Sequence, residues 1–337
     1  MKIAISADWH LRGSDLRQVR SQLQELVQKS GGCGMLIVVG DIFDRPSIGD
    51  QHQSTGAVAE VAIEAVAAFA CAPTRRVILL PGQHDYSGVG AKDALHVFDG
   101  MERVSIVREP ERLKWGDLTL AIVPWMWRGG AVDPAILTRP CDLFLAHLRV
   151  EGAIMGQITY EARPGDWSLS RAALEAIPAE HVALGDFHRR QDLTDGIGGY
   201  VGALRQLDFG EEGNPQGFEI VDTKTWEVEW VELGQCPYHR TVEVDTGDSI
   251  PIRGANERLR VRYLSPPNLD EVRDLEAEGV RVEQVVAKEE RIRRAEIPPG
   301  VMRDKRELIR LWASTQNPAL SEERVETMVA VWEEAHR

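Results

Sequence analysis

Five short groups of acidic, histidine and amide side chains could carry out metal chemistry in this chain. Each group follows a run of apolar, β-branched residues, which is the pattern of a buried strand. Carboxylate oxygens and imidazole nitrogens suit Mn, Fe and Zn, and none of the groups contains a thiol. Five strands that end in such side chains predict a two-metal hydrolase. The groups are Asp8-Trp9-His10, Gly40-Asp41, Gly82-Gln83-His84-Asp85, Ala146-His147 and Gly185-Asp186-Phe187-His188.

Seven of these side chains form the predicted set of metal ligands. Asp8 and His10 are two residues apart at a strand end, so their side chains point to the same face. Gln83 and His84 are adjacent, so one can bind a metal ion while the other faces a substrate. Two ions about 3.5–4 Å apart can hold a bridging hydroxide and neutralise the oxyanions of a displacement at phosphorus. The predicted ligands are Asp8, His10, Asp41, Gln83, His147, Asp186 and His188.

The elements that must position these residues alternate between strands and helices. This alternation, with some consecutive strands, favours an α/β fold that is a layered α+β sandwich. From about Gly198 the pattern changes to strand-like segments separated by Gly, Asn and Pro. Among them, WEVEWVEL alternates apolar and acidic residues, as an antiparallel strand with one wet face does. We expect the segments from Gly198 onward to form the second sheet that closes the sandwich.

The chain divides into three predicted parts: residues 1–235, 236–300 and 301–337. The middle part predicts a small β-α-β capping module, and the last part predicts a pair of helices. The last helix carries an apolar stripe at positions i, i+3, i+4 and i+7. The residues alone leave open whether this stripe packs on its own domain or docks another protein. The stripe consists of Val325, Met328, Val329 and Trp332.

The bulk composition is that of an ordinary globular protein, with 43% hydrophobic and 27% charged residues. The four cysteines form no CxxC pair, and no apolar run approaches the ~20 residues that span a bilayer. We therefore expect a cytoplasmic protein with reduced thiols, no signal peptide and no membrane contact. The net charge of −14 is unusual for a protein that grips nucleic acid alone. Any contact with DNA is thus expected to be local or shared with a partner.

The ordered motifs resemble those of the calcineurin-like metallophosphoesterases, and more closely those of the SbcD-type nucleases of double-strand-break repair. That family shows D-x-H, G-D-x-x-D, G-N-H-D, a single histidine after a strand, and G-H-x-H. The resemblance covers about residues 1–235 and extends loosely to the capping module and the terminal helices. It implies a core of two packed sheets flanked by helices. In this chain the motifs read Asp8-Trp9-His10, Gly40-Asp41-Ile42-Phe43-Asp44, Gly82-Gln83-His84-Asp85, His147 and Gly185-Asp186-Phe187-His188.

The resemblance also implies a role for each residue. His84 would stabilise the transition state or protonate the leaving oxygen. We assign Asp85 to the catalytic residues with it, in a supporting position that accepts a hydrogen bond from His84 or from a backbone amide. The first ion would be bound by Asp8, His10, Asp41 and His188. The second ion would be bound by Asp41, Gln83, His147 and Asp186.

The activity that the resemblance implies is manganese-dependent hydrolysis of DNA phosphodiesters in recombination and repair. It comprises exonuclease cleavage of duplex ends and endonuclease cleavage of single strands. The implied partner is an SbcC-type ATPase with a long coiled coil, which a C-terminal helical segment of the nuclease grips. This favours the docking interpretation of the stripe at 325–332. A homodimer and a nucleoid-associated location, or the host cytoplasm for a phage protein, are further expectations.

Two ligand positions depart from the family pattern, because Gln83 replaces Asn and Asp186 replaces His. Both side chains remain oxygen donors, so we predict an active enzyme that prefers Mn or Mg over Zn. Two alternatives stay open. One is a stand-alone enzyme that acts on small phosphoesters, since the core motifs fit it equally well. The other is a catalytically weakened scaffold subunit that binds the ATPase.

Three arginines are the predicted contacts to the DNA backbone. Arg189 and Arg190 directly follow the last ligand, and Arg12 lies on a loop that should approach the site. Residues 288–310, with eight Lys or Arg against five Asp or Glu, form the most basic stretch. For any single arginine, a solvated surface position is the competing interpretation.

Overall fold

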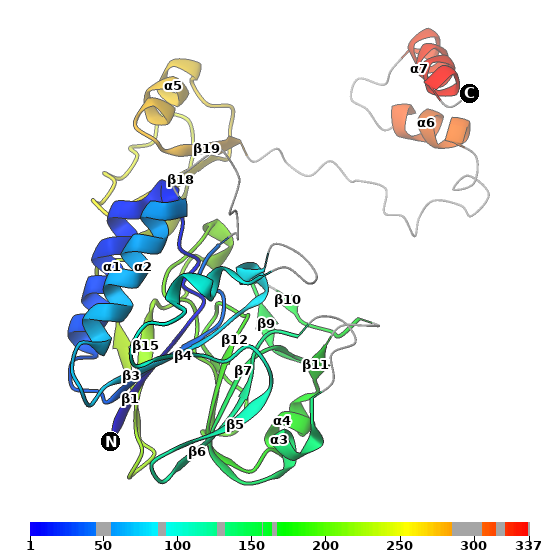
Figure 1. Cartoon of the computed structure of the whole chain (residues 1–337). Coiled ribbons are helices and arrows are strands. Elements are labelled where there is room, and N and C mark those ends of the chain that lie inside the picture. Colours follow the sequence, from blue (N-terminus) through cyan, green and yellow to red (C-terminus); the bar gives the residue numbers. More distant parts are fainter. Residues whose placement is uncertain are drawn as a thin grey trace.

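The computed structural model describes residues 1–44, 55–86, 92–126, 132–156, 158–163, 167–284, 305–314 and 321–335. The two largest sheets of the described chain have six strands each (Figure 1). The first has the strand order β16-β15-β1-β2-β3-β4. Its strands are β1 (Lys2–Ala7), β2 (Met35–Val39), β3 (Arg76–Leu80), β4 (Val104–Ile106), β15 (Gly217–Asp222) and β16 (Val228–Glu232).

Four neighbouring strands of the first sheet, β1 to β4, run parallel. In their register Ala7 lies beside Val39, and Val39 lies beside Leu80, so these strands end at one edge of the sheet. All five residues of β2 are buried, as expected for a strand covered on both faces. Helices α1 (Leu16–Lys29) and α2 (Thr55–Ala70) cover the outer face, where their apolar side chains share one core with those of β2.

The second sheet has the order β13-β14-β12-β7-β6-β5. Its central strands β7 and β12 run parallel, with His147 beside Gly185. A common core that contains Ile5, Ile37 and Leu145 joins the two sheets face to face. The strands are β5 (Glu111–Trp115), β6 (Leu118–Val123), β7 (Cys141–His147), β12 (Ala179–Gly185), β13 (Gln191–Asp192) and β14 (Gly198–Tyr200).

Short elements complete this half of the molecule. Helices α3 (Pro134–Thr138) and α4 (Arg171–Glu175) bury Ile136 and Leu174 in the core on the outer face of the second sheet. Strand β8 (Arg149–Val150) pairs with β11 (Ser168–Leu169), and β9 (Ile154–Met155) pairs with β10 (Ile158–Thr159). The 3₁₀ turns are Gly13–Asp15, Gln83–Asp85, Ala94–Phe98 and Phe209–Glu211. The predicted α/β sandwich of two packed sheets flanked by helices is confirmed.

The composition of the second sheet corrects one prediction. Strands β15 and β16 extend the first sheet, because β15 pairs antiparallel with the free edge of β1. Of the segments from Gly198 onward, β14 is the strand that joins the second sheet. Our expectation that these segments form the second sheet together was therefore wrong. An alternating pattern predicts which face of a strand is wet, but it does not identify the neighbouring strand.

The rest of the chain contains a third sheet and a helix pair. Strands β17 (Tyr238–Val244), β18 (Glu257–Tyr263) and β19 (Arg281–Gln284) run parallel, and α5 (Leu269–Ala277) connects the last two. They share a small apolar core of their own. The predicted boundaries at residues 235 and 300 stay predictions, and residues 288–304 of the basic stretch lie outside the described residues.

The C-terminal helices α6 (Lys305–Ser314) and α7 (Glu322–Ala335) contact each other, and Arg310 pairs with Glu326 at 2.7 Å. Within the predicted stripe, Val325 and Val329 are buried, whereas Met328 is 38% exposed and Trp332 is half-buried. The structure thus uses part of this stripe for packing. In the described part of the chain, no helix is both long and apolar enough to cross a bilayer.

Candidate metal centre

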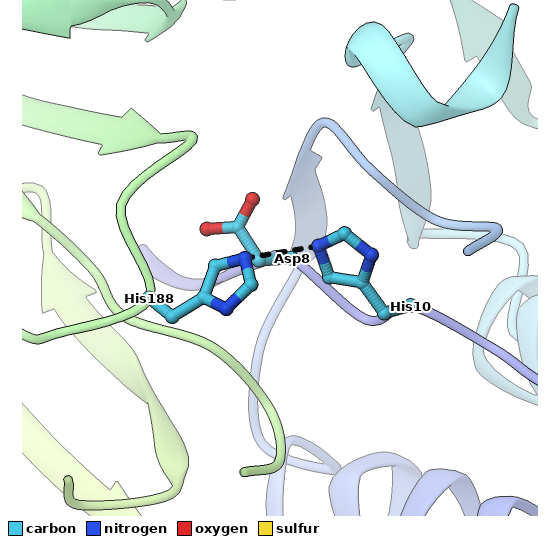
Figure 2. Close-up of side chains that lie close together, drawn as sticks. All are labelled: Asp8, His10 and His188. Carbon is cyan, nitrogen blue, oxygen red and sulfur yellow. Dashed lines mark hydrogen bonds between the residues drawn. The ribbon is translucent and has the colours of Figure 1, made fainter. Parts of the chain in front are cut away.

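The ends of five strands from both sheets deliver the predicted ligands to one place. Asp8 follows β1, Asp41 follows β2, and His147 ends β7. Figure 2 shows that Asp8 and His10, from one segment of the chain, meet His188 from another. Each of three groups of side chains offers ligand atoms that lie within 4.8 Å of one another. These groups are Asp8, His10 and His188; His10, Asp41 and His84; and Asp8, Asp41 and His147.

Tight turns after the strands aim these ligands. Asp8, His10 and Asp41 have positive φ angles of 49°, 44° and 48°, a conformation that costs free energy in any residue with a side chain. Two positions next to the ligands must be glycine, because a ligand side chain lies too close to each of them for a Cβ atom to fit. A Cβ atom at Gly40 would lie 1.9 Å from Nδ1 of His147, and one at Gly82 would lie 2.1 Å from Oδ1 of Asp41. Backbone strain at this edge therefore positions the donor atoms.

On one side of the centre, which we call the first side, two histidines face each other. Nε2 of His10 lies 3.0 Å from Nε2 of His188, the contact that is dashed in Figure 2. Behind each ring stands a carboxylate: Asp44 lies 3.3 Å from Nδ1 of His10, and Glu211 accepts from Nδ1 of His188 at 2.5 Å. Because Glu211 holds the Nδ1–H of His188, that ring presents its Nε2 lone pair to a metal ion, whereas Asp44 is an acidic neighbour of His10. The first predicted ion therefore fits these residues.

Asp41 and His147 lie between the two sides. Nδ1 of His147 donates to the carbonyl oxygen of Val39 at 3.0 Å, so its Nε2 faces Oδ2 of Asp41 at 3.5 Å. Both of these facing atoms are buried, and among the described residues neither has a hydrogen-bond partner. Buried polar atoms without partners are rare and costly, and here they are a carboxylate oxygen and an imidazole nitrogen that can bind a metal ion. They fit an ion that both side chains would bind.

On the other side, which we call the second side, both carboxylate oxygens of Asp186 accept hydrogen bonds from neighbouring side chains. Its Oδ1 accepts from Nε2 of Gln83 at 2.6 Å, and its Oδ2 accepts from Nε of Arg149 at 2.9 Å. Asp186 belongs to none of the three groups of ligand atoms found among the described residues. Oε1 of Gln83 is buried and has no partner among the described residues. The second predicted ion thus finds donor atoms without a hydrogen bond on Asp41, Gln83 and His147, whereas each oxygen of Asp186 already accepts one.

Burial and charge set the protonation of the centre. Burial raises the pKa of Asp8 to about 7. Burial would also raise the pKa of Asp41, but the nearby His147 and His10 outweigh it and hold that pKa well below its usual range. Burial would lower the pKa of His188, but the hydrogen bond to Glu211 and the charge of Asp8 raise it to about 9. Burial lowers the pKa of His10, and Asp41 raises that of His147 to about 10 against the effect of burial. Without metal, the centre therefore keeps an extra proton on His147 and His188 but not on His10.

The two residues predicted to be catalytic have different surroundings. His84 is exposed, its Nδ1 lies 2.8 Å from the carbonyl oxygen of Asp44, and its ring meets the edge of His10. A substrate can reach it. Asp85 is fully buried and accepts hydrogen bonds from the backbone amides of Gly82, Phe43 and Ile42.

These three bonds tie the turn before His84 to the turn after Asp41. No hydrogen bond from His84 to Asp85 is among the contacts of these described residues. We therefore correct the assignment of Asp85 to a positioning residue, which is the backbone-amide role that the sequence left open.

The predicted DNA contacts are only partly available. Arg189 is exposed beside the centre. Arg190 pairs with Glu219 at 3.1 Å and stacks on the ring of Trp230, so its guanidinium is held by these two residues rather than by a DNA phosphate. Arg12 pairs with Asp44 at 2.9 Å.

Sequence reasoning missed Glu211 and Arg149. Glu211 lies in a 3₁₀ turn that no spacing connects to the ligands. Arg149 had a signal, because it lies two residues after His147 and side chains at that spacing share a face of an extended chain.

Residues 1–135 match the family model of the calcineurin-like phosphoesterases. This part of the chain is therefore similar to the calcineurin-like metallophosphoesterases. The matched residues include Asp8, His10, Asp41, Gln83 and His84, whereas His147, Asp186 and His188 lie beyond them. This family and the donor atoms of the centre indicate metal-dependent hydrolysis of phosphoesters.

Among solved structures, the chain resembles the phosphoesterase YfcE from E. coli. The two share 12% sequence identity and a TM-score of 0.30, over 69% of this chain and 99% of that one. A similarity this low indicates no substrate. No curated protein matches the sequence.

Proposed function

We propose that this chain is a metal-dependent nuclease that hydrolyses DNA phosphodiesters with Mn²⁺ and works with an SbcC-type ATPase. The observation that carries the proposal is the cluster of four buried side chains, Asp8, His10, Asp41 and His147, with the half-buried His188, and with the exposed His84 at its rim. Bound metal would supply Lewis-acid stabilisation of the phosphoryl oxygens and an activated water. Mg²⁺ suits the carboxylate donors as well.

The side chains around the cluster divide the remaining work. His84 is exposed and its backbone amide donates to Oδ1 of Asp41 at 2.7 Å, so its imidazole stands at a fixed distance from the ligands. In that position it can donate a proton to the leaving oxygen of a phosphodiester. Asp44 and Glu211 orient the histidines of the first side.

Contacts between the third sheet and the centre support a polymeric substrate. The guanidinium of Arg260 lies over the ring of Phe209 at 4.5 Å, and that of Arg281 lies over it at 5.7 Å. Phe209 belongs to the same 3₁₀ turn as Glu211, which holds His188. Of these two arginines, Arg260 is 12% exposed, whereas Arg281 is 60% exposed although it pairs with Glu283. Arg281 and Arg189 are therefore the side chains that can contact a DNA backbone on this side of the centre.

The helix pair supports a more restricted docking surface than the sequence pattern predicted. Val325 and Val329 are buried, but Met328 and Val331 on α7 are 38% and 61% exposed, and Trp312 on α6 is 50% exposed. We propose that these exposed apolar residues, rather than the whole stripe, contact the ATPase. Exposed apolar side chains on a helical surface are typical of protein contact sites.

The test is the cleavage of end-labelled linear duplex DNA with Mn²⁺, with an EDTA control. Asp41→Ala should lower the cleavage rate by at least about 10²–10³-fold, because Asp41 belongs to two of the three ligand groups. The matched control is Asp270→Ala, since that side chain is 86% exposed and distant in sequence from the ligands.

Three outcomes would contradict the proposal. Intact DNA together with rapid hydrolysis of bis-p-nitrophenyl phosphate would favour the small-phosphoester alternative. No turnover of either substrate, even with the ATPase added, would favour the scaffold. Activity with Zn²⁺ and none with Mn²⁺ would refute the predicted metal preference.

A further inference from the structure

Arg149 forms an ion pair inside the metal centre that the ligand motifs do not predict. Its Nε donates to Oδ2 of Asp186 at 2.9 Å. The side chain of Asp186 is 2% exposed, whereas that of Arg149 is 30% exposed. The pair therefore places a buried carboxylate behind a cation that solvent and substrate can reach. Such a pair is much less screened than a surface ion pair.

Two aromatic rings keep the guanidinium in place. It lies 5.7 Å from the ring centre of Trp125 and 5.9 Å from that of Tyr160. Trp125 is in turn fixed by its backbone amide, which donates to the carbonyl oxygen of Pro81 at 3.0 Å, just before Gln83. Cation–π contacts of this kind orient an arginine without neutralising it. Arg149 is thus a preorganised positive charge at the second side.

The pairing changes what the second side offers to a metal ion. Both oxygens of Asp186 accept hydrogen bonds, one from Arg149 and one from Gln83. The first side, in contrast, has carboxylates behind its histidines, which increase the affinity of a ligand for a cation. A guanidinium behind a carboxylate has the opposite effect and also repels a second dication.

We propose that Arg149 is a fixed cation of this centre that withdraws Asp186 from metal binding and contacts a phosphoester oxygen itself. The chain then binds one divalent ion tightly and a second one at least tenfold more weakly. The guanidinium of Arg149 is 30% exposed and supplies positive charge at the second side, and its planar shape suits the geometry of a phosphate. The inference rests on the proposed metal-dependent hydrolysis of phosphoesters.

The first experiment counts ions without any DNA, by titration of Mn²⁺ against the full chain with detection of free Mn²⁺ by electron paramagnetic resonance. For the native chain we expect one tight site and one site at least tenfold weaker. Arg149→Met releases Asp186, so the second site should tighten at least tenfold. The control Arg171→Met removes a surface arginine that pairs with Glu175, and it should leave both sites unchanged.

The second experiment measures how inorganic phosphate binds to the chain at saturating Mn²⁺, by calorimetry. Arg149→Met should weaken phosphate binding about tenfold, and Arg171→Met should not change it. Arg149→Gln keeps a donor for Asp186 without the charge, so it reports the same two effects if the Met variant does not fold. A structural role alone would lower the melting temperature but would not tighten a metal site.

Two equal tight sites in the native chain would overturn the inference. So would unchanged metal and phosphate binding in both Arg149 variants, or no binding of Mn²⁺ at all. Loss of DNA cleavage with these binding results intact would instead contradict the nuclease proposal alone. The two proposals can therefore fail separately.

Discussion

The two sides of the metal centre use similar donor atoms but place opposite charges behind them. On the first side, each histidine has a carboxylate next to its Nδ1 atom. Asp44 lies beside His10, and Glu211 lies beside His188. On the second side, the carboxylate of Asp186 instead pairs with the guanidinium of Arg149. A carboxylate behind a ligand raises its affinity for a cation, and a guanidinium lowers it. The comparison teaches that the ligands alone do not determine how strongly each ion is held.

The largest difference between the sides should appear when one donor is removed from each. His188→Asn removes a ligand of the first side, and we expect the rate of phosphodiester hydrolysis to fall by about 10²–10³-fold. Asp186→Asn should cost tenfold or less, because Asp186 is bonded to Arg149 and Gln83 and an amide oxygen can still accept there. Steady-state kinetics at saturating Mn²⁺ measure both. Equal losses in the two variants would remove the asymmetry.

Sequence could predict much of this centre because strand ends fix where the ligands go. Asp8 and Asp41 follow the parallel neighbours β1 and β2 of the first sheet, and His147 ends β7 of the second sheet, so the packing of the two sheets brings the three side chains together. The residues behind the ligands escaped prediction. Glu211 reaches His188 from a turn 23 positions further along the chain, and no pattern of spacing indicates such a contact.

The sheet to which β15 and β16 belong escaped prediction for a related reason. The alternation of these segments was visible in the sequence, but the free edge of β1 that receives β15 was not. Pairing between strands that are distant in sequence depends on the packed structure of the whole domain, which local patterns do not encode.

A smaller effect should follow from changing the residue behind a first-side ligand. Glu211→Gln keeps the size of the side chain but removes the charge that holds Nδ1 of His188. We expect the pH-independent affinity of the tight Mn²⁺ site, corrected for the protons that an ion displaces, to fall about 10–100-fold, as is usual for such partners of metal-binding histidines. Calorimetric titration measures it. Glu229→Gln is the matched control, since that side chain is 64% exposed and pairs with Lys2 on the surface.

An unchanged affinity in Glu211→Gln would show that the carboxylate only completes the packing of the 3₁₀ turn. The comparison between the two sides would then depend on Arg149 alone.

A further difference concerns the pH dependence of metal binding. In the metal-free chain the pKa of His188 is raised to about 9 and that of His147 to about 10, the latter by Asp41 against the effect of burial. Both rings are therefore protonated at pH 7, and an ion must displace those protons. The affinity for Mn²⁺ should rise with pH, by about tenfold per pH unit for each proton released, and level off above about pH 9–10.

Measuring this pH dependence in Glu211→Gln distinguishes the proton on His188 from the proton on His147. Without the carboxylate, the pKa of His188 falls toward its ordinary value, whereas His147, held by Val39 and Asp41, keeps its proton. The slope of log affinity against pH between 7 and 8 should then decrease by up to one. Titrations at several pH values measure the slope, and the Glu229→Gln control should keep the native one. A native slope in Glu211→Gln would mean that the proton of His188 does not depend on Glu211, and that the first side owes its affinity to Asp8 and Asp41 instead.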